Sequence, residues 1–229
     1  MKSIKLLTIL SVAFFASIFT SCSDNSSSAD GNSFDAAEVC PTEGTNAYGE
    51  PNRGTFTDAR DGQVYKYTTI GNQVWIAQNL NFDDGMSPCA DTLCTIEKGR
   101  IYTTVTAQTA CPTGWHLPSA EEWQVLLASV GGIENAGYHL KATEGWVPLN
   151  PGWQSNGTDE CGFAVKPIPV NGVLGNGDGG KKRDGFIALL WTSTPADYTW
   201  YAVEFQTQNL HAVFADDRVG YLSVRCVRD

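Results

Sequence analysis

The strongest hydrophobic periodicity in the chain lies within residues 111–132, CPTGWHLPSAEEWQVLLASVGG. Its apolar positions recur at helical spacing: Trp123, Leu126, Leu127 and Val130. Ser119, followed by Glu122, forms a capping-box pattern, which predicts that a helix begins here. Gly131-Gly132 predicts its end, because glycine is favoured just past a helix C-terminus. One face of this helix is therefore expected to be buried, with Trp123 as its largest apolar group.

Residues 54–82 show a different pattern, in which short apolar runs are separated by turn signals. Asp61-Gly62 and Gly71-Asn72 lie between runs rich in Val, Tyr, Thr and Ile, which is typical of an antiparallel β-meander. The apolar side of these strands is expected to contain Val64, Tyr65, Tyr67, Val74, Trp75 and Ile76. Asn79 and Asn81 follow, and we interpret them as buried side chains that satisfy loop backbone groups.

The rest of the chain predicts a strand and a short helix, then a long loop region, and finally four strands. Residues 99–111 predict a strand running into a short first helix, whereas residues 137–184 carry mostly loop signals. Four later runs are predicted to form an antiparallel sheet: residues 186–194, 199–206, 210–216 and 220–229. Arg225 and Arg228 in the last run are expected to pair with acidic groups. The whole pattern predicts an α+β domain of short antiparallel sheets, one or two helices and long loops.

A processing signal stands at the N-terminus. Lys2 and Lys5 accompany the apolar run 4–19, and small residues follow before Cys22. This order predicts a lipoprotein signal peptide over residues 1–21, with Cys22 as the lipidated residue of the mature chain. An ordinary secretory peptide, in which Cys22 is incidental, is the alternative.

The composition of the chain after Cys22 predicts a flexible tether followed by a folded domain. Residues 22–39 are rich in Ser, Asp and Asn, and they predict a flexible tether because they have little apolar surface to bury. Residues 40–229 are expected to fold as one domain, and the chain's 7 Trp and 10 Phe residues are ample for a core. The formal net charge of −10 argues against nucleic acid or an anionic lipid surface as the partner.

Cysteine usage fits an oxidising compartment. Of the 7 cysteines, those beyond Cys22 are Cys40, Cys89, Cys94, Cys111, Cys161 and Cys226. An even number in an exported chain predicts three disulfides, and Cys89 and Cys94 are near enough in sequence to close a small loop. Metal ligation is the alternative, but no second Cys or His pair follows at zinc-finger spacing.

Several segments together carry a family resemblance. The signature ACPTGWHLPSAEEW is accompanied upstream by DGQVYKYTTIGNQVWIAQNLN and GRIYT. Downstream follow GYHLKATEGW, NGTDECGFAVKP, LLWTST and SVRCVRD. These segments cover nearly all of residues 54–229 and closely resemble the Fibrobacter succinogenes major paralogous domain, a family of bacterial secreted and lipid-anchored proteins.

The resemblance implies a C-type lectin-like fold, stapled by disulfides and related to the formylglycine-generating enzyme domain. In such folds a disulfide joins the helical region to the last strand, so the resemblance pairs Cys111 with Cys226. Cys40 and Cys161 are then the remaining pair. The resemblance also implies an exported protein, attached to the outer membrane or cell surface through the lipid on Cys22.

No motif identifies a catalytic centre. Residues 170–185 form a Gly-rich loop in which Asp178 is a candidate ligand-binding residue, yet the phosphate-loop and calcium-loop patterns are incomplete. No cofactor is therefore expected, with calcium as the one candidate kept open. His116, His139 and His211 are isolated, and we interpret them as surface or hydrogen-bonding side chains.

Two aromatic side chains are predicted to face a ligand. Trp153 and Tyr198 lie in polar loop contexts, where a ring outside the core is free to stack on a sugar face. The triplet Glu50-Pro51-Asn52 resembles a lectin sugar motif, but the companion Trp-Asn-Asp is missing. We therefore interpret the triplet as a coincidence.

Three hypotheses for the function follow. A non-enzymatic binding or adhesion module, for polysaccharide or a surface protein, is favoured by the lectin-like resemblance and the aromatic content. An envelope scaffold without a small ligand is the second. An oxidase of the formylglycine-generating type is the third and requires a free thiol at Cys111 or Cys226, so no enzymatic activity is expected.

Overall fold

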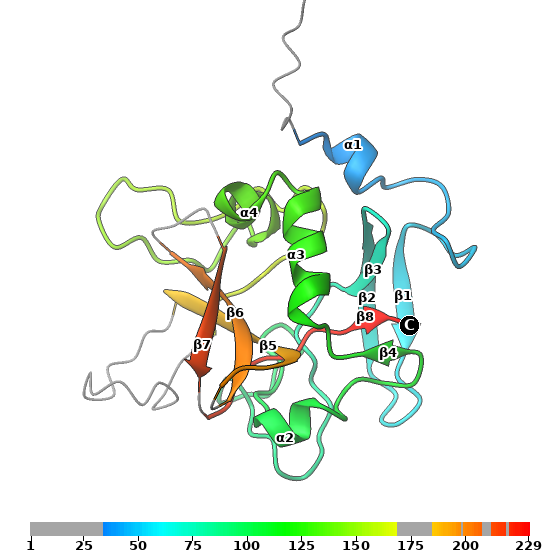
Figure 1. The fold of residues 1–229 in the computed structure, drawn as a ribbon, viewed down its shortest axis with the longest axis vertical. Coiled ribbons are helices and arrows are strands. Elements are labelled where there is room, and N and C mark those ends of the chain that lie inside the picture. The colour runs from blue at the N-terminus through cyan, green and yellow to red at the C-terminus, as the bar shows by residue number, and fades with distance from the viewer. Residues whose placement is uncertain (1–33, 169–184, 198, 208–211, 219) are drawn as a thin grey trace, which may run out of the picture. The chain divides into compact units, whose positions relative to one another are not determined.

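Two antiparallel sheets form the framework of the protein in the computed structural model (Figure 1). The structure describes residues 34–168, 185–197, 199–207, 212–218 and 220–229. The first sheet has the order β1 (Arg53–Thr57), β2 (Val64–Ile70), β3 (Gln73–Ile76), β8 (Val227–Arg228) and β4 (Trp115–His116). The second sheet has the order β5 (Ile187–Pro195), β6 (Trp200–Gln206) and β7 (Ala212–Arg218).

The predicted meander is confirmed as β1, β2 and β3, which pair antiparallel in sequence order. Phe56 lies opposite Tyr65, and Tyr67 lies opposite Ile76. The expected apolar residues are buried except Val64, which is 52% exposed. Val64 is the first residue of β2, and it alternates with the buried Tyr65, so its side chain belongs to the solvent face of the strand.

The predicted capped helix is confirmed as α3 (Ala120–Ser129). Ser119 and Glu122 form the full capping box, and the residues expected on the inner face are buried. Figure 1 shows α3 standing between the two sheets. Its Trp123 ring lies 4.7 Å from Trp75 of β3 and 6.0 Å from Phe163, measured between ring centroids. These aromatic contacts join the helix to the first sheet.

The apolar core has two parts, and β3 and β5 contribute to both. Val74 and Ile76 face the first part, which also contains Tyr102 and Trp191, whereas Trp75 faces the second. On β5, Ile187, Leu189 and Trp191 belong to the first part and Ala188 and Leu190 to the second. Because successive side chains of a strand point to opposite faces, a strand buried on both faces separates two cores.

Two further helices differ from the sequence-based expectation. The predicted first helix is a single turn, α2 (Thr104–Ala107), and a helix α4 (Ile133–Leu140) forms where loop was expected. α4 begins directly after the glycine pair that ends α3, and Gly137 in its middle weakens its helical signal. Among the described residues no helix has the length and apolarity needed to cross a membrane.

The N-terminal boundary of the folded part lies earlier than expected. A one-turn helix, α1 (Ala36–Val39), forms within the segment assigned to the tether, 22–39. Phe34, Ala36 and Val39 pack against the second part of the core, and the backbone N–H of Gly71 donates to the carbonyl oxygen of Val39. The last residues of that segment are therefore part of the domain, because their few apolar groups find a surface to cover.

The C-terminal run does not form the predicted fourth strand of the second sheet. Only β8 is a strand, and it lies in the first sheet between β3 and β4. The preceding segment 222–226 crosses between the sheets, with Ser223 bonded to β5 and the Val224 and Cys226 carbonyls accepting from the 76–80 region. All of its side chains are buried, so alternation could not reveal which sheet it joins.

Three disulfides staple the fold. They join Cys40 to Cys161, Cys89 to Cys94 and Cys111 to Cys226, with Cα–Cα distances of 5.2, 4.8 and 5.9 Å. These are the three pairs named from the sequence. The first ties the N-terminal segment after α1 to the loop before β5, and the last ties the lead-in to α3 to the C-terminal segment. Few helices, small antiparallel sheets and disulfides agree with the expected α+β class.

Candidate functional site

A charged groove with a volume of about 640 Å³ is the candidate functional site. It lies where β1 and β2 meet the loop before β5, and it draws its lining from segments far apart in sequence. Its charged residues are Arg53, Lys66, Glu97, Asp159, Lys166 and Arg225. The volume is within the range of about 300–1,000 Å³ that is usual for small-molecule sites.

Arg225 lies at the base of the groove and is buried, with 1% of its surface exposed. Its Nε donates to Asn79 Oδ1 at 3.1 Å, Nη1 donates to the carbonyl of Phe163, and Nη2 donates to the carbonyl of Ala164 at 2.9 Å. Its guanidinium also lies over the Phe163 ring, 4.4 Å from the centroid. Burial lowers the pKa of Arg225 to about 9, although the negative charge of Asp159 acts in the opposite direction.

Asp159 is a half-buried carboxylate in the lining of the groove. Burial raises its pKa above the ordinary value of 3.8, whereas the N–H of Ala164 and the charges of Arg225 and Arg53 act to lower it. Its Oδ1 accepts from the Ala164 N–H at 2.6 Å. Asp159 and Ala164 both have left-handed backbones, with φ of 51° and 50°. Strained residues and a perturbed carboxylate in one groove are typical of a functional site.

Arg53 forms one wall and is held by backbone oxygens rather than by a carboxylate. Its Nη2 donates to the carbonyls of Cys40 at 3.1 Å and Glu160 at 2.6 Å. Its Nε is buried and has no hydrogen-bond partner among the described residues. Gly162 packs against this guanidinium with φ of 64°, and an added Cβ there would lie 3.2 Å from Arg53 Nη1. Glycine at residue 162 therefore permits both the turn and the close approach.

The rim is formed by Lys66, Lys166 and Glu97. Lys166 Nζ lies 3.5 Å from Glu97 and 4.0 Å from Glu144, and both of these carboxylates are largely exposed. Lys66 makes no ion pair with any residue that the structure describes. Among the described lining residues four are cationic and two are anionic, although the whole chain has a net charge of −10. The groove is thus a basic region on an acidic protein.

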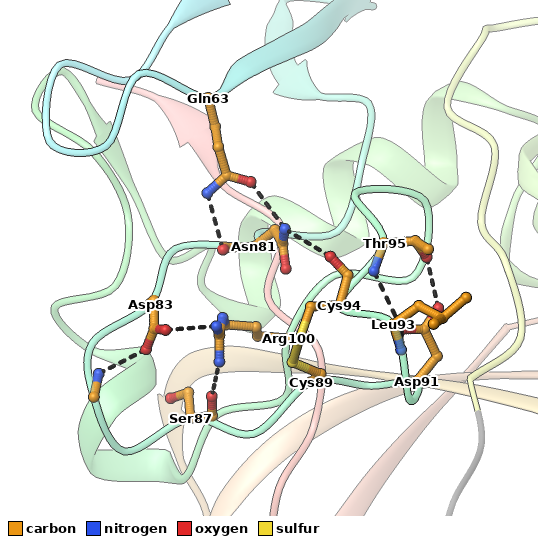
Figure 2. Close-up of a disulfide and its surroundings, with 11 residues drawn as sticks. Gln63, Asn81, Asp83, Ser87, Cys89, Asp91, Leu93, Cys94, Thr95 and Arg100 are labelled. Atoms are coloured by element: carbon orange, nitrogen blue, oxygen red, sulfur yellow. Dashed lines mark hydrogen bonds and ion pairs between the residues drawn. A yellow bond between two sulfur atoms is a disulfide. The ribbon is translucent and has the colours of Figure 1, made fainter.

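The Cys89–Cys94 disulfide closes a small loop (Figure 2), shortly before Glu97 in the sequence. Asp91 accepts from the backbone N–H groups of Leu93 and Thr95, at 3.0 and 3.2 Å, and from the Thr95 hydroxyl at 2.6 Å. Asn81 Nδ2 donates to the Cys94 carbonyl at 3.4 Å. These contacts fix the start of the segment that carries Glu97 into the groove.

An ion pair between Arg100 and Asp83 holds the segment around the Cys89–Cys94 disulfide from outside the small loop that this disulfide closes. Arg100 Nη2 lies 2.6 Å from Asp83, and its Nη1 donates to the Ser87 carbonyl at 2.6 Å (Figure 2). The segment around the disulfide is therefore held at both ends by hydrogen bonds, which positions Glu97 without using its carboxylate.

Both described histidines make hydrogen bonds to carboxylates, as interpreted from the sequence. His116 Nδ1 lies 2.8 Å from Asp229 and its Nε2 lies 2.8 Å from Glu122, whereas His139 bonds Glu160. Burial alone would lower the pKa of His116, but the hydrogen bonds to Asp229 and Glu122 outweigh it, so the pKa is raised above 6.5. The arrangement ties the last residue of the chain to the start of α3.

Replacing His116 by glutamine should therefore cost stability in a pH-dependent way. A raised pKa in the folded state means that protonated His116 contributes fully below 6.5 and that the contribution is lost as pH rises through the raised pKa. The difference in free energy of unfolding between the wild type and His116→Gln is expected to be larger near about pH 5.5 than near about pH 9. Urea unfolding at both pH values measures it, with Gln124→Ala on exposed α3 surface as a control. Equal differences at both values would contradict this account.

Trp153 is the one predicted ligand-binding residue that falls within the described part of the chain. Trp153 is exposed, at 57%, as expected, but it is not among the lining residues. Tyr198, Asp178 and Cys22 lie outside the described residues. No group of three or more His, Cys, Asp or Glu suited to a metal ion occurs in the described part of the chain.

Most residues of the groove were not predicted from the sequence. Arg225 was expected to pair with an acidic group, yet its hydrogen bonds go to an amide and two carbonyls; Arg228 does pair with Glu50, at 3.2 Å. Lys66 and Arg53 occupy ordinary strand positions, where a charged side chain signals only a solvent face. The left-handed backbone at Asp159 has no local signature of the kind that glycine provides.

Comparison with known proteins gives one match. The model of the Fibrobacter succinogenes major domain matches residues 68–228, which is more than half of the chain. No curated protein and no solved structure matched the chain. The matched range includes most of the groove lining, from Thr68 to Arg225, together with α3 and both sheets except β1 and the first four residues of β2. The chain therefore belongs to the Fibrobacter succinogenes major domain family.

Proposed function

We propose that this protein is a lipid-anchored envelope protein that binds a polysaccharide in the charged groove. The groove is the observation that carries the proposal. It has the volume of a ligand site, and its walls present both donors and acceptors, which is what a polyhydroxylated ligand requires. The proposed binding is non-enzymatic, and its role is adhesion to or capture of surface material.

We further infer that the fold is a branch of the C-type lectin-like fold. Support comes from its two small antiparallel sheets, its long loops and the Cys111–Cys226 disulfide. That bond links the lead-in to α3 with the C-terminal segment, as the lectin-like architecture implies. The same bond disfavours an oxidase of the formylglycine-generating type, because that chemistry would require a free thiol at Cys111 or Cys226.

The anchor is proposed from the sequence of residues 1–22. A basic start, an apolar run and small residues before Cys22 favour lipid attachment at this cysteine, followed by export to the outer membrane or cell surface. Residues 23–33 lie between Cys22 and the described part of the domain, and their Ser-, Asp- and Asn-rich composition favours a spacer between the groove and the membrane. A binding site held away from the lipid is suited to an insoluble or surface-bound polymer.

The test uses the full-length protein, expressed with export and purified from membranes in detergent. It is sedimented with insoluble xylan, cellulose and bacterial cell-wall preparations, with and without EDTA. Gln78→Trp is expected to abolish retention, because Gln78 lines the groove and a larger ring would fill it. Gln124→Trp is the matched control, since it makes the same substitution on exposed α3 surface. Cys22→Ser is expected to shift the protein from the membrane to the soluble fraction.

Each result assigns the site or rejects it. Loss of retention in Trp153→Ala, with Gln78→Trp unaffected, would move the binding site from the groove to Trp153. Sensitivity to EDTA would indicate calcium. Failure of the folded wild type on every polymer would reject polysaccharide binding, and the envelope-scaffold alternative would then be favoured.

A further inference from the structure

The arginines whose side chains the structure describes fall into two classes, those that line the groove and those that do not. Outside it, Arg60, Arg100 and Arg228 each have a carboxylate within 4.0 Å, at 2.7, 2.6 and 3.2 Å. Inside it, Arg53 and Arg225 donate to amide and carbonyl oxygens and make no ion pair with a described residue. These two arginines therefore lack a carboxylate in direct contact, and Asp159 acts on both of them only through its longer-range charge.

The two lysines of the groove are also weakly neutralised. Lys66 makes no ion pair with a described residue, and Lys166 shares only the exposed Glu97 and Glu144 at 3.5 and 4.0 Å. Exposed pairs of this kind are worth about 0–1 kcal/mol, so they neutralise Lys166 weakly. The groove therefore retains a net positive field, which would attract an anionic group while the surrounding acidic surface repels it.

Arg53 is also short of acceptors. Its Nη2 is used by two backbone carbonyls, but its Nε is buried and has no partner among the described residues. A buried donor on a charged group without an acceptor costs about 1–3 kcal/mol or more. A negatively charged ligand group in the groove would offset this cost through its attraction to the positive charge of the guanidinium.

On these grounds we propose that the groove recognises the carboxylate of an acidic sugar, so that the bound polysaccharide is a uronate-containing polymer. This inference rests on the proposed function and names its ligand class. The carboxylate lies between Arg53 and Lys66, and Asp159 and Glu97 accept hydrogen bonds from ring hydroxyls. The presence of these two carboxylates favours a singly charged ligand group over a phosphate, which they would repel more strongly.

The experiment compares one polymer with and without its charge. Full-length protein in detergent is titrated with oligogalacturonate and with the same oligomer after reduction of its carboxyl groups. The acidic form is expected to bind at least about tenfold more tightly, which corresponds to one charged hydrogen bond. Lys66→Gln is expected to weaken binding of the acidic form by a similar factor, because Lys66 is exposed and its ammonium group makes no hydrogen bond or ion pair within the described part of the chain.

Arg228→Gln is the charge-matched control, since it also removes one positive charge but lies outside the groove lining. Its affinity for oligogalacturonate should match the wild type at moderate salt, where distant charges are screened. An equal loss of affinity for oligogalacturonate in Lys66→Gln and Arg228→Gln would overturn the inference, because the attraction would then depend on the overall charge of the protein and not on the groove. Equal binding of the acidic and reduced oligomers, blocked by Gln78→Trp, would overturn acid recognition and leave polysaccharide binding intact. Absence of binding to either oligomer and to every neutral polymer would reject the proposed function itself.

Discussion

Replacing Arg225 by alanine is expected to lower the free energy of unfolding by about 3–5 kcal/mol. The guanidinium joins three segments that are far apart in sequence, because it bonds Asn79 after β3 and the carbonyls of Phe163 and Ala164. Its removal leaves these buried acceptors without donors and opens a cavity beneath the Phe163 ring. Urea unfolding followed by tryptophan fluorescence measures the change, because Trp75 and Trp123 lie against Phe163.

Arg228→Ala provides the comparison, three residues away on the same segment. Arg228 pairs with Glu50 at 3.2 Å, and both side chains are partly exposed, so the substitution should cost about 1 kcal/mol or less. Arg225→Lys should fall between the two, because an ammonium group keeps the charge but lacks the fork that reaches three acceptors. If Arg225→Ala costs no more than Arg228→Ala, the buried guanidinium does not hold these segments together.

Removal of either long-range disulfide is expected to cost about 5 kcal/mol, against about 2 kcal/mol for the short one. Cys40–Cys161 and Cys111–Cys226 span 121 and 115 residues, whereas Cys89–Cys94 spans only 5. A bond that closes a longer loop removes more conformational freedom from the unfolded chain. The change of both cysteines to alanine in each pair, followed by urea unfolding under non-reducing conditions, gives the three values.

The order of the three losses in unfolding free energy tests the loop-length argument most directly. The Cys89–Cys94 variant should remain folded, because Asp91 and Arg100 still hold the segment through hydrogen bonds. Besides the stability loss of about 2 kcal/mol, we expect weaker ligand binding, since Glu97 follows shortly after Cys94 in the chain. A larger stability loss for this pair than for Cys40–Cys161 would contradict the loop-length argument.

Local patterns predicted the elements whose causes are local. The capping box at Ser119 and the helical spacing of Trp123 and Leu127 defined α3, because helix signals act over a few residues. The two turn signals defined the meander for the same reason. α4 was missed because Gly132 and Gly137 resemble loop residues, and only its packing against α3 and β7 favours the helix.

The candidate site could not be predicted in this way. Arg53 and Asp159 are more than a hundred positions apart, and they approach because β1 and the loop before β5 meet beside the Cys40–Cys161 disulfide. Nothing in the sequence near Lys66 distinguishes a lysine on a groove from a lysine on an open strand. Trp153, which a composition argument selected, is exposed but does not line the groove.

The sequence by itself determined the family, the capped helix α3, the three-stranded meander and the even set of cysteines, since each depends on residue types at short, fixed spacings. Only the tertiary structure decided that residues 222–226 cross from one sheet to the other and that Arg225 is buried at the base of a groove. The physical reason is that hydrogen-bond partners and net local charge depend on which distant segments meet. In this protein that meeting gathers the four cations of the groove on a chain that is acidic overall.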